Sequence, residues 1–161
     1  MKASRKVLVI GGLLLSAWGM SYGLYYALFA EHQTLETIGS ALATSFASAS
    51  QRKMEASRVN LASYTVTLFD YTRQVDVHSH WIGLGILLMG LGVIFNRVSF
   101  GERLRFLLAL PLLIGSAVFP LGVMLQTMDR GPGPRILASI GAALVTGALA
   151  GVAIGFLRAR E

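Results

Sequence analysis

Four stretches of the 161-residue chain are apolar and almost free of charge. With the flanking residues that complete each helix, they cover residues 7–30, 76–96, 106–128 and 136–157. An α-helix rises 1.5 Å per residue, so about 20 residues cross the ~30 Å hydrocarbon core of a bilayer. The pattern therefore predicts an all-α membrane protein with four transmembrane helices in a single integral membrane domain.

The first and second stretches need separate interpretation. Residues 7–30 hold 24 residues without a charge, which exceeds the apolar core of a cleaved signal peptide and favours an uncleaved anchor. The apolar run of the second stretch extends only from Trp81 to Phe95, too short to span. We therefore expect its helix to begin earlier, near Asp76.

Residues 31–75, between the first two spans, are polar but patterned. Apolar side chains recur at near-helical spacing, as Leu35, Ile38, Leu42, Phe46 and Ala49, and then as Met54, Leu61, Thr65 and Leu68. The spacing predicts a helical hairpin, with a break near residues 48–51. Residues 64–69 are also rich in residues that favour strands, so the secondary structure of the returning arm, residues 52–75, stays open.

The distribution of Lys and Arg predicts the orientation. Eight basic residues fall on the side of the two termini and six on the other, of which four lie in the long segment. Short basic connections stay in the cytoplasm. We expect both termini in the cytoplasm, residues 31–75 outside, and a bacterial-type cytoplasmic membrane. The net charge of +6 does not indicate nucleic-acid binding, because no basic stripe with interleaved aromatic residues occurs.

All three histidines, His32, His78 and His80, fall at the outer boundary of the predicted membrane. Neutral imidazole is the commonest metal ligand and a common axial ligand of haem. Asp76 precedes His80 by four residues, so the two share a helix face, and Asp76 is either a further metal ligand or an orienting group. These four residues are the candidate site, for haem b or a metal such as copper. The alternative is that the histidines simply suit the membrane interface.

A short motif carries a resemblance. Residues 78–85, His-Ser-His-Trp-Ile-Gly-Leu-Gly, open a membrane helix that is followed by a polar turn and another apolar helix. This resembles the H-x-H helix openings of small multi-helix membrane proteins related to haem-copper oxidase subunit I. The resemblance covers roughly residues 76–128 and implies haem or metal ligation by His78 or His80. The chain lacks further histidines in the last two predicted helices, so a single haem or metal is the most it implies.

Small residues recur every fourth position along the last predicted span. They are Ala143, Gly147, Gly151 and Gly155. Such a series lets helix backbones approach closely. We expect this face to pack against other membrane subunits or within the chain, while the remaining apolar faces contact lipid.

Two hypotheses about function follow, and neither predicts catalytic residues or an enzyme acting on its own. The first is a small membrane protein that binds haem or a transition metal near its outer surface. It would serve electron transfer or metal handling beside a larger membrane redox complex. The alternative is an accessory or assembly subunit of a membrane complex with no chemistry of its own. A sensor whose outer hairpin binds a small ligand ranks last.

Overall fold

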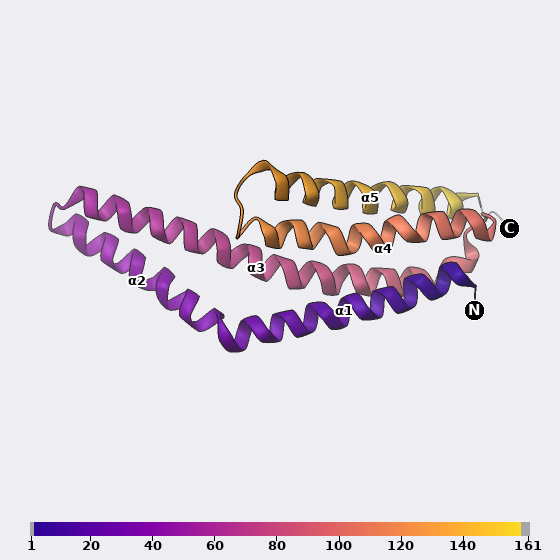
Figure 1. The fold of residues 1–161 in the computed structure, drawn as a ribbon, viewed down its shortest axis with the longest axis horizontal. Helices are drawn as coiled ribbons and strands as arrows, with labels where there is room; N and C mark the ends of the chain where they lie inside the picture. The colour runs from indigo at the N-terminus through magenta and orange to yellow at the C-terminus, as the bar shows by residue number, and fades with distance from the viewer. Residues whose placement is uncertain (1, 159–161) are drawn as a thin grey trace. The chain divides into compact units, whose positions relative to one another are not determined.

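The chain is built from α-helices, as a computed structural model that describes residues 2–158 shows (Figure 1). The described residues contain no strand. The helices are α1 (Ala3–Phe29), α2 (Glu31–Ser50), α3 (Met54–Ile94), α4 (Glu102–Leu125) and α5 (Pro132–Leu157), with a 3₁₀ turn at Phe95–Arg97 after α3. The all-helical fold class is therefore confirmed.

Four of these helices, α1, α3, α4 and α5, are long and apolar enough to cross a membrane. This agrees with the predicted integral membrane protein. The helix that carries the second span begins at Met54 rather than near Asp76, and it includes the returning arm. The strand-favouring run is helical, and within it the Thr65 hydroxyl donates to the Leu61 carbonyl at 2.9 Å, a bond that threonine commonly makes in helices.

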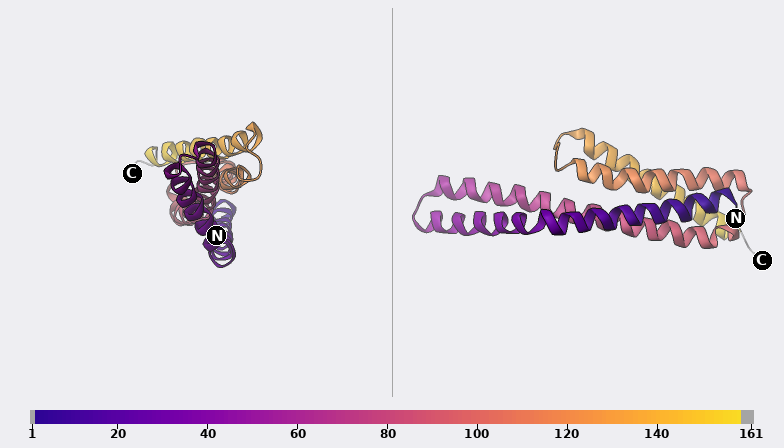
Figure 2. Two further views of the ribbon diagram at one scale, coloured as in Figure 1. Left: turned by 90° about the vertical axis from the view of Figure 1, so that its left-hand side faces the viewer. Right: turned by 60° about the horizontal axis from the view of Figure 1, so that its bottom comes forward.

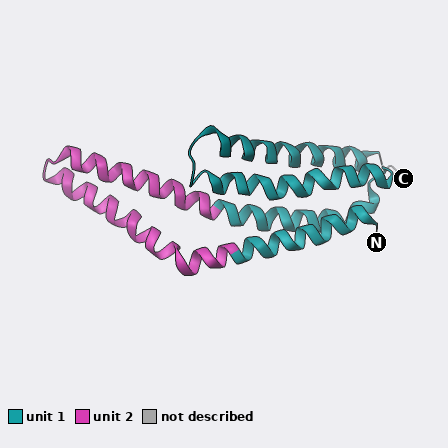
Figure 3. Ribbon diagram, viewed as in Figure 1, with its two compact units in different colours: residues 1–21, 76–161 teal, residues 22–75 magenta. Residues whose placement is uncertain are grey.

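The chain forms two compact units (Figure 3). One contains residues 1–21 and 76–161, and the other contains residues 22–75. Helix α3 contributes its first part to the second of these and its remainder to the first. The larger unit contains most of the apolar residues of the four candidate spans, whereas residues 22–75 contain α2 and the polar part of α3.

In the larger unit, α1 and α3 pack through glycines. A methyl group added at Gly85 would lie 2.6 Å from the carbonyl oxygen of Gly12 and 2.9 Å from the backbone nitrogen of Ser16. At Gly19, added carbon would lie 2.9 Å from Cβ of Trp81. The absence of side chains at these positions lets the two backbones touch, which is how helices associate without a hydrophobic driving force in lipid.

Helices α4 and α5 pack in the same way. A methyl group at Gly115 would lie 2.7 Å from the carbonyl oxygen of Gly141, and one at Gly141 would lie 2.5 Å from the backbone nitrogen of Phe119. The segment between α3 and α4 is tied to α5 by a hydrogen bond from the Ser99 amide to the Gly155 carbonyl, at 3.1 Å. The buried guanidinium of Arg105 donates to the carbonyl of Val98.

The predicted small-residue face of α5 divides into two parts. Added carbon at Gly151 would meet the Leu108 side chain at 2.7 Å, and at Gly155 it would meet the Phe100 ring at 2.8 Å. Gly147 has nothing within 4 Å of such an atom, and Ala143 is exposed. Two of the four positions thus pack within the chain, and contact between this face and another subunit stays a prediction.

The α1–α3 contact predicts a clear contrast between two glycines of α3. Replacing Gly85 by alanine forces the helix backbones apart, so Gly85→Ala should destabilise the protein by about 1–3 kcal/mol. The matched control is Gly83→Ala, because Gly83 has nothing within 4 Å. Thermal unfolding of both variants in detergent, followed by circular dichroism, measures the difference. Equal stability of the two variants would contradict the packing described.

Candidate functional site

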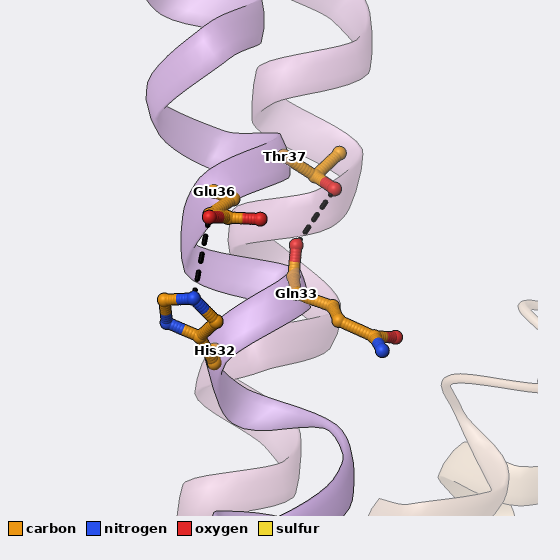
Figure 4. A network of polar contacts seen from close by, with 4 residues as sticks. All are labelled: His32, Gln33, Glu36 and Thr37. Carbon is orange, nitrogen blue, oxygen red and sulfur yellow. Dashed lines mark hydrogen bonds and ion pairs between the residues drawn. The ribbon is translucent and has the colours of Figure 1, made fainter.

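His32 lies in the first turn of α2 and faces solvent (Figure 4). Its Nε2 is 3.2 Å from Oε1 of Glu36, and the two side chains are 85% and 70% exposed. The next turn is tied by Thr37, whose hydroxyl donates to the Gln33 carbonyl at 2.8 Å. An exposed pair of this kind contributes little to stability. It does place an imidazole and a carboxylate together on one side of the helix.

His80 is held on two sides in the larger unit. Its Nδ1 is 2.6 Å from the carbonyl oxygen of Asp76. Its ring packs edge-on against the Phe119 ring, with 4.8 Å between the ring centroids. A carbonyl oxygen only accepts, so Nδ1 is the donor and Nε2 carries the lone pair in the neutral ring. This is the arrangement found in metal-ligating histidines, whose second nitrogen is fixed by a carbonyl or carboxylate. The backbone of Asp76 makes this bond.

His78 and His80 lie two residues apart within the regular helix α3. Two residues correspond to about 200° around a helix, so their side chains leave it in nearly opposite directions. Both could reach one metal only if the helix began between them, and it begins at Met54 instead. Each of the two is half-buried.

The predicted ligands fall in different units. His32 belongs to residues 22–75, and His78, His80 and Asp76 belong to the larger unit. Among residues 2–158, no group of three or more His, Cys, Asp or Glu side chains is placed to hold a metal ion. A shared site that combines His32 with His78 or His80 stays a prediction.

A second candidate site is the helical hairpin formed by α2 and the first part of α3, which run side by side (Figures 1 and 2). Two contacts fix their register. The Ser45 hydroxyl donates to the Ser57 carbonyl at 3.0 Å near the turn, and the Tyr71 hydroxyl donates to Oε1 of Glu31 at 3.1 Å near the other end. Tyr22 also donates to the side-chain oxygen of Gln74.

The residues that line the interface of the two hairpin helices recur alternately every three and every four residues, as in a coiled coil. These buried or half-buried positions are Glu31, Thr34, Ile38, Ala41, Ser45 and Ser48 on α2, and Ser57, Asn60, Tyr64, Thr67, Tyr71 and Gln74 on α3. Almost all are polar or small. The interior of the hairpin therefore buries little apolar surface of its own.

Five large apolar side chains of the hairpin lie one residue beyond these interior positions. They are Leu35, Leu42 and Phe46 on α2, and Leu61 and Leu68 on α3, and we refer to them as the hairpin face. Leu35, Phe46, Leu61 and Leu68 are 45%, 68%, 48% and 37% exposed. A step of one residue turns roughly 100° around a helix. Because the two helices are antiparallel, the same step turns both sets toward the same side of the hairpin.

The other side of the hairpin differs in character. One residue before the interior positions, α2 carries Gln33, Thr37, Ser40, Thr44 and Ala47, and α3 carries Ala56, Val59, Ser63, Val66, Asp70 and Arg73. Polar side chains prevail there, with Val59 and Val66 as the large apolar exceptions. The hairpin thus presents one predominantly apolar side and one predominantly polar side.

The sequence pattern had identified the apolar residues of the hairpin but not their common side. Ile38 and Leu42, for example, were grouped in one helical series, although Ile38 lies between the helices and Leu42 on the hairpin face. The missing signal was the second series, of serine, threonine and alanine, displaced by one residue. Polar interior positions are not recognised by a search for apolar periodicity.

Comparison with known proteins gives no relative: no family model matches this chain, and no curated protein or solved structure matches it either.

Proposed function

We propose that this protein is an accessory or assembly subunit of the membrane, which acts by protein–protein contact through the hairpin face. The supporting observation is the exposure of Leu35, Phe46, Leu61 and Leu68 on one side of the hairpin. Exposed apolar side chains gathered on one side of a water-facing segment mark an interaction surface. The proposed function is the binding of a partner protein that covers this surface.

The composition of the hairpin supports its placement in water rather than lipid. Residues 31–75 carry four acidic and four basic side chains, and a charge at the centre of a bilayer costs about 2.5–3.5 kcal/mol. Helix α2 is also not among the helices apolar enough to span a membrane. With eight Lys and Arg on the side of the termini, we place both termini in the cytoplasm and the hairpin outside.

The energy available from this surface is adequate for specific contact. Complete burial of one Leu or Phe side chain contributes about 1.5–3 kcal/mol. The five side chains of the hairpin face are already partly covered, so a partner would gain on the order of 5 kcal/mol from them. An association confined to the membrane plane loses less translational freedom than one in solution, because both partners are already anchored.

A photoreactive side chain tests the proposal. Benzoylphenylalanine in place of Phe46 should give a protein adduct after illumination of native membranes, because Phe46 lies on the hairpin face. The same residue in place of Val59 should give at least tenfold less adduct. Val59 is the matched control, since the two side chains are 67% and 68% exposed but lie on opposite sides.

Three outcomes of this experiment would contradict the proposal. They are the absence of an adduct at both positions, equal adducts at both, or an adduct formed only at Val59. Denaturing gels with detection of this chain measure the adducts, and comparable amounts of the two variants in the membrane provide the control.

A second candidate function rests on His80. We propose as the alternative that the protein binds haem or a transition metal such as copper near its outer surface, for electron transfer or metal handling beside a larger redox complex. The supporting observation is the 2.6 Å contact from Nδ1 of His80 to the Asp76 carbonyl, which directs the lone pair of Nε2 away from the backbone. His78 and His32 are the other proposed ligands.

Absorption spectra and metal analysis of the gently purified protein test this second function. Bound haem would give a Soret band that shifts on reduction with dithionite, and bound copper would appear at a stoichiometric ratio. His80→Ala should abolish either signal, whereas Ser79→Ala on the neighbouring position should retain it. A colourless, metal-free wild-type protein that keeps its native partners would contradict the second function and leave the first standing.

A further inference from the structure

We infer that the partner of the hairpin face is a second copy of this chain, and that two hairpins join face to face in a four-helix bundle. The inference rests on the proposed contact function and names the occupant of that surface. Four observations support it: a socket on α3, the register of the hairpin, its charge balance and its area.

The socket is a shallow cavity of about 320 Å³ on the first part of α3, lined by Thr65, Leu68, Phe69, Thr72 and Arg73. The first four of these stand at positions i, i+3, i+4 and i+7. Four residues in that pattern form the hole that receives one side chain from a facing helix in knobs-into-holes packing. The socket includes Leu68 of the hairpin face, so the geometry calls for an apolar side chain from another helix.

The register of the hairpin identifies that side chain. The contacts from Tyr71 to Glu31 and from Ser45 to Ser57 place residue 35 of α2 level with residue 67 of α3. Two copies inserted in the same orientation are related by a two-fold axis along the membrane normal, which keeps equal residues at equal height. This symmetry sets α2 of one copy opposite α3 of the other. Leu35 of the second copy therefore lies level with the socket around Leu68.

Charge does not oppose this pairing. Within residues 31–75 the acidic residues are Glu31, Glu36, Glu55 and Asp70, and the basic residues are Arg52, Lys53, Arg58 and Arg73. The segment is therefore neutral in formal charge. Two identical surfaces with a large net charge would repel each other, whereas a neutral one associates with itself without that cost.

The area of the surface is also sufficient. Helix α2 has 20 residues and is about 30 Å long, and two adjacent helices are about 20 Å wide. One side of the hairpin therefore offers on the order of 600 Å², and two copies bury on the order of 1,200 Å² in total. Specific interfaces begin at about this size.

Co-purification of two differently tagged copies tests the pairing. Both tags should be recovered together from wild-type membranes. Phe46→Glu places a charge in the interface and should lower the recovery of the second tag at least tenfold. Val59→Glu, with the same charge at equal exposure on the other side, should leave recovery within twofold of the wild type. Circular dichroism of both variants verifies that each is folded.

Cysteine pairs test the predicted register, since the chain contains no cysteine of its own. Mild oxidation of membranes holding copies with Leu35→Cys and copies with Leu68→Cys should give a mixed disulfide dimer. Copies with Leu35→Cys and copies with Val59→Cys should not form one. Equal yields from the two mixtures, or no dimer in either, would overturn the inference.

The results also separate this inference from the function on which it rests. A photo-adduct from position 46 with the mass of two chains supports both. An adduct of another mass, with no co-purification of tagged copies, overturns the second copy as partner and leaves the contact function intact. Absence of any adduct overturns both.

Discussion

The packing of the helices depends on one series of positions along α3, spaced alternately by three and four residues. In the hairpin this series comprises Ser57, Asn60, Tyr64, Thr67, Tyr71 and Gln74, and in the larger unit it continues at the same spacing through His78 to Trp81, Gly85, Leu88 and Gly92. An unbroken spacing of this kind keeps one side of a long helix against its neighbours. The two units use this series differently. In the apolar part, glycines permit close backbone contact, whereas in the polar part small and hydroxylated side chains fill the interior.

A polar interior has a consequence for the outside of the hairpin. Ala41 and Ser45 are the buried residues of α2, so the hairpin gains little from burying its own surface. Five of its large apolar side chains, the hairpin face, are displaced by one position toward one side, whereas Val59 and Val66 lie on the other. With the hairpin in water, as we propose, a partner that covers the hairpin face would stabilise it. The proposed contact would therefore use the same spacing that forms the hairpin, and the inferred second copy would match it in length, height and charge.

The sequence was sufficient to predict those features that depend on the hydrophobicity of long stretches of the chain. Four apolar stretches indicated the helices long enough to span, and Leu35, Phe46, Leu61 and Leu68 indicated helical periodicity between the first two. The structure was needed for features set by neighbours in space. Gly83 and Gly85 look alike in sequence, yet only Gly85 meets another backbone. The backbone carbonyl of Asp76 bonds to the His80 ring, a contact that the sequence did not indicate, while a role of the Asp76 side chain as metal ligand or orienting group stays a prediction.

The most direct test of this account is the labelling of single cysteines along the chain with a membrane-impermeant maleimide in intact and permeabilised cells. Ser50→Cys, at the end of α2, should react in intact cells. Gly90→Cys, in the apolar part of α3, should react in neither, because the four-span arrangement places this position in the bilayer. Arg103→Cys, at the start of α4, should react only after permeabilisation. Labelling of Arg103→Cys in intact cells with protection of Ser50→Cys would contradict the placement of the hairpin outside. Labelling of Gly90→Cys would contradict the division of α3 into a water-facing part and a membrane part.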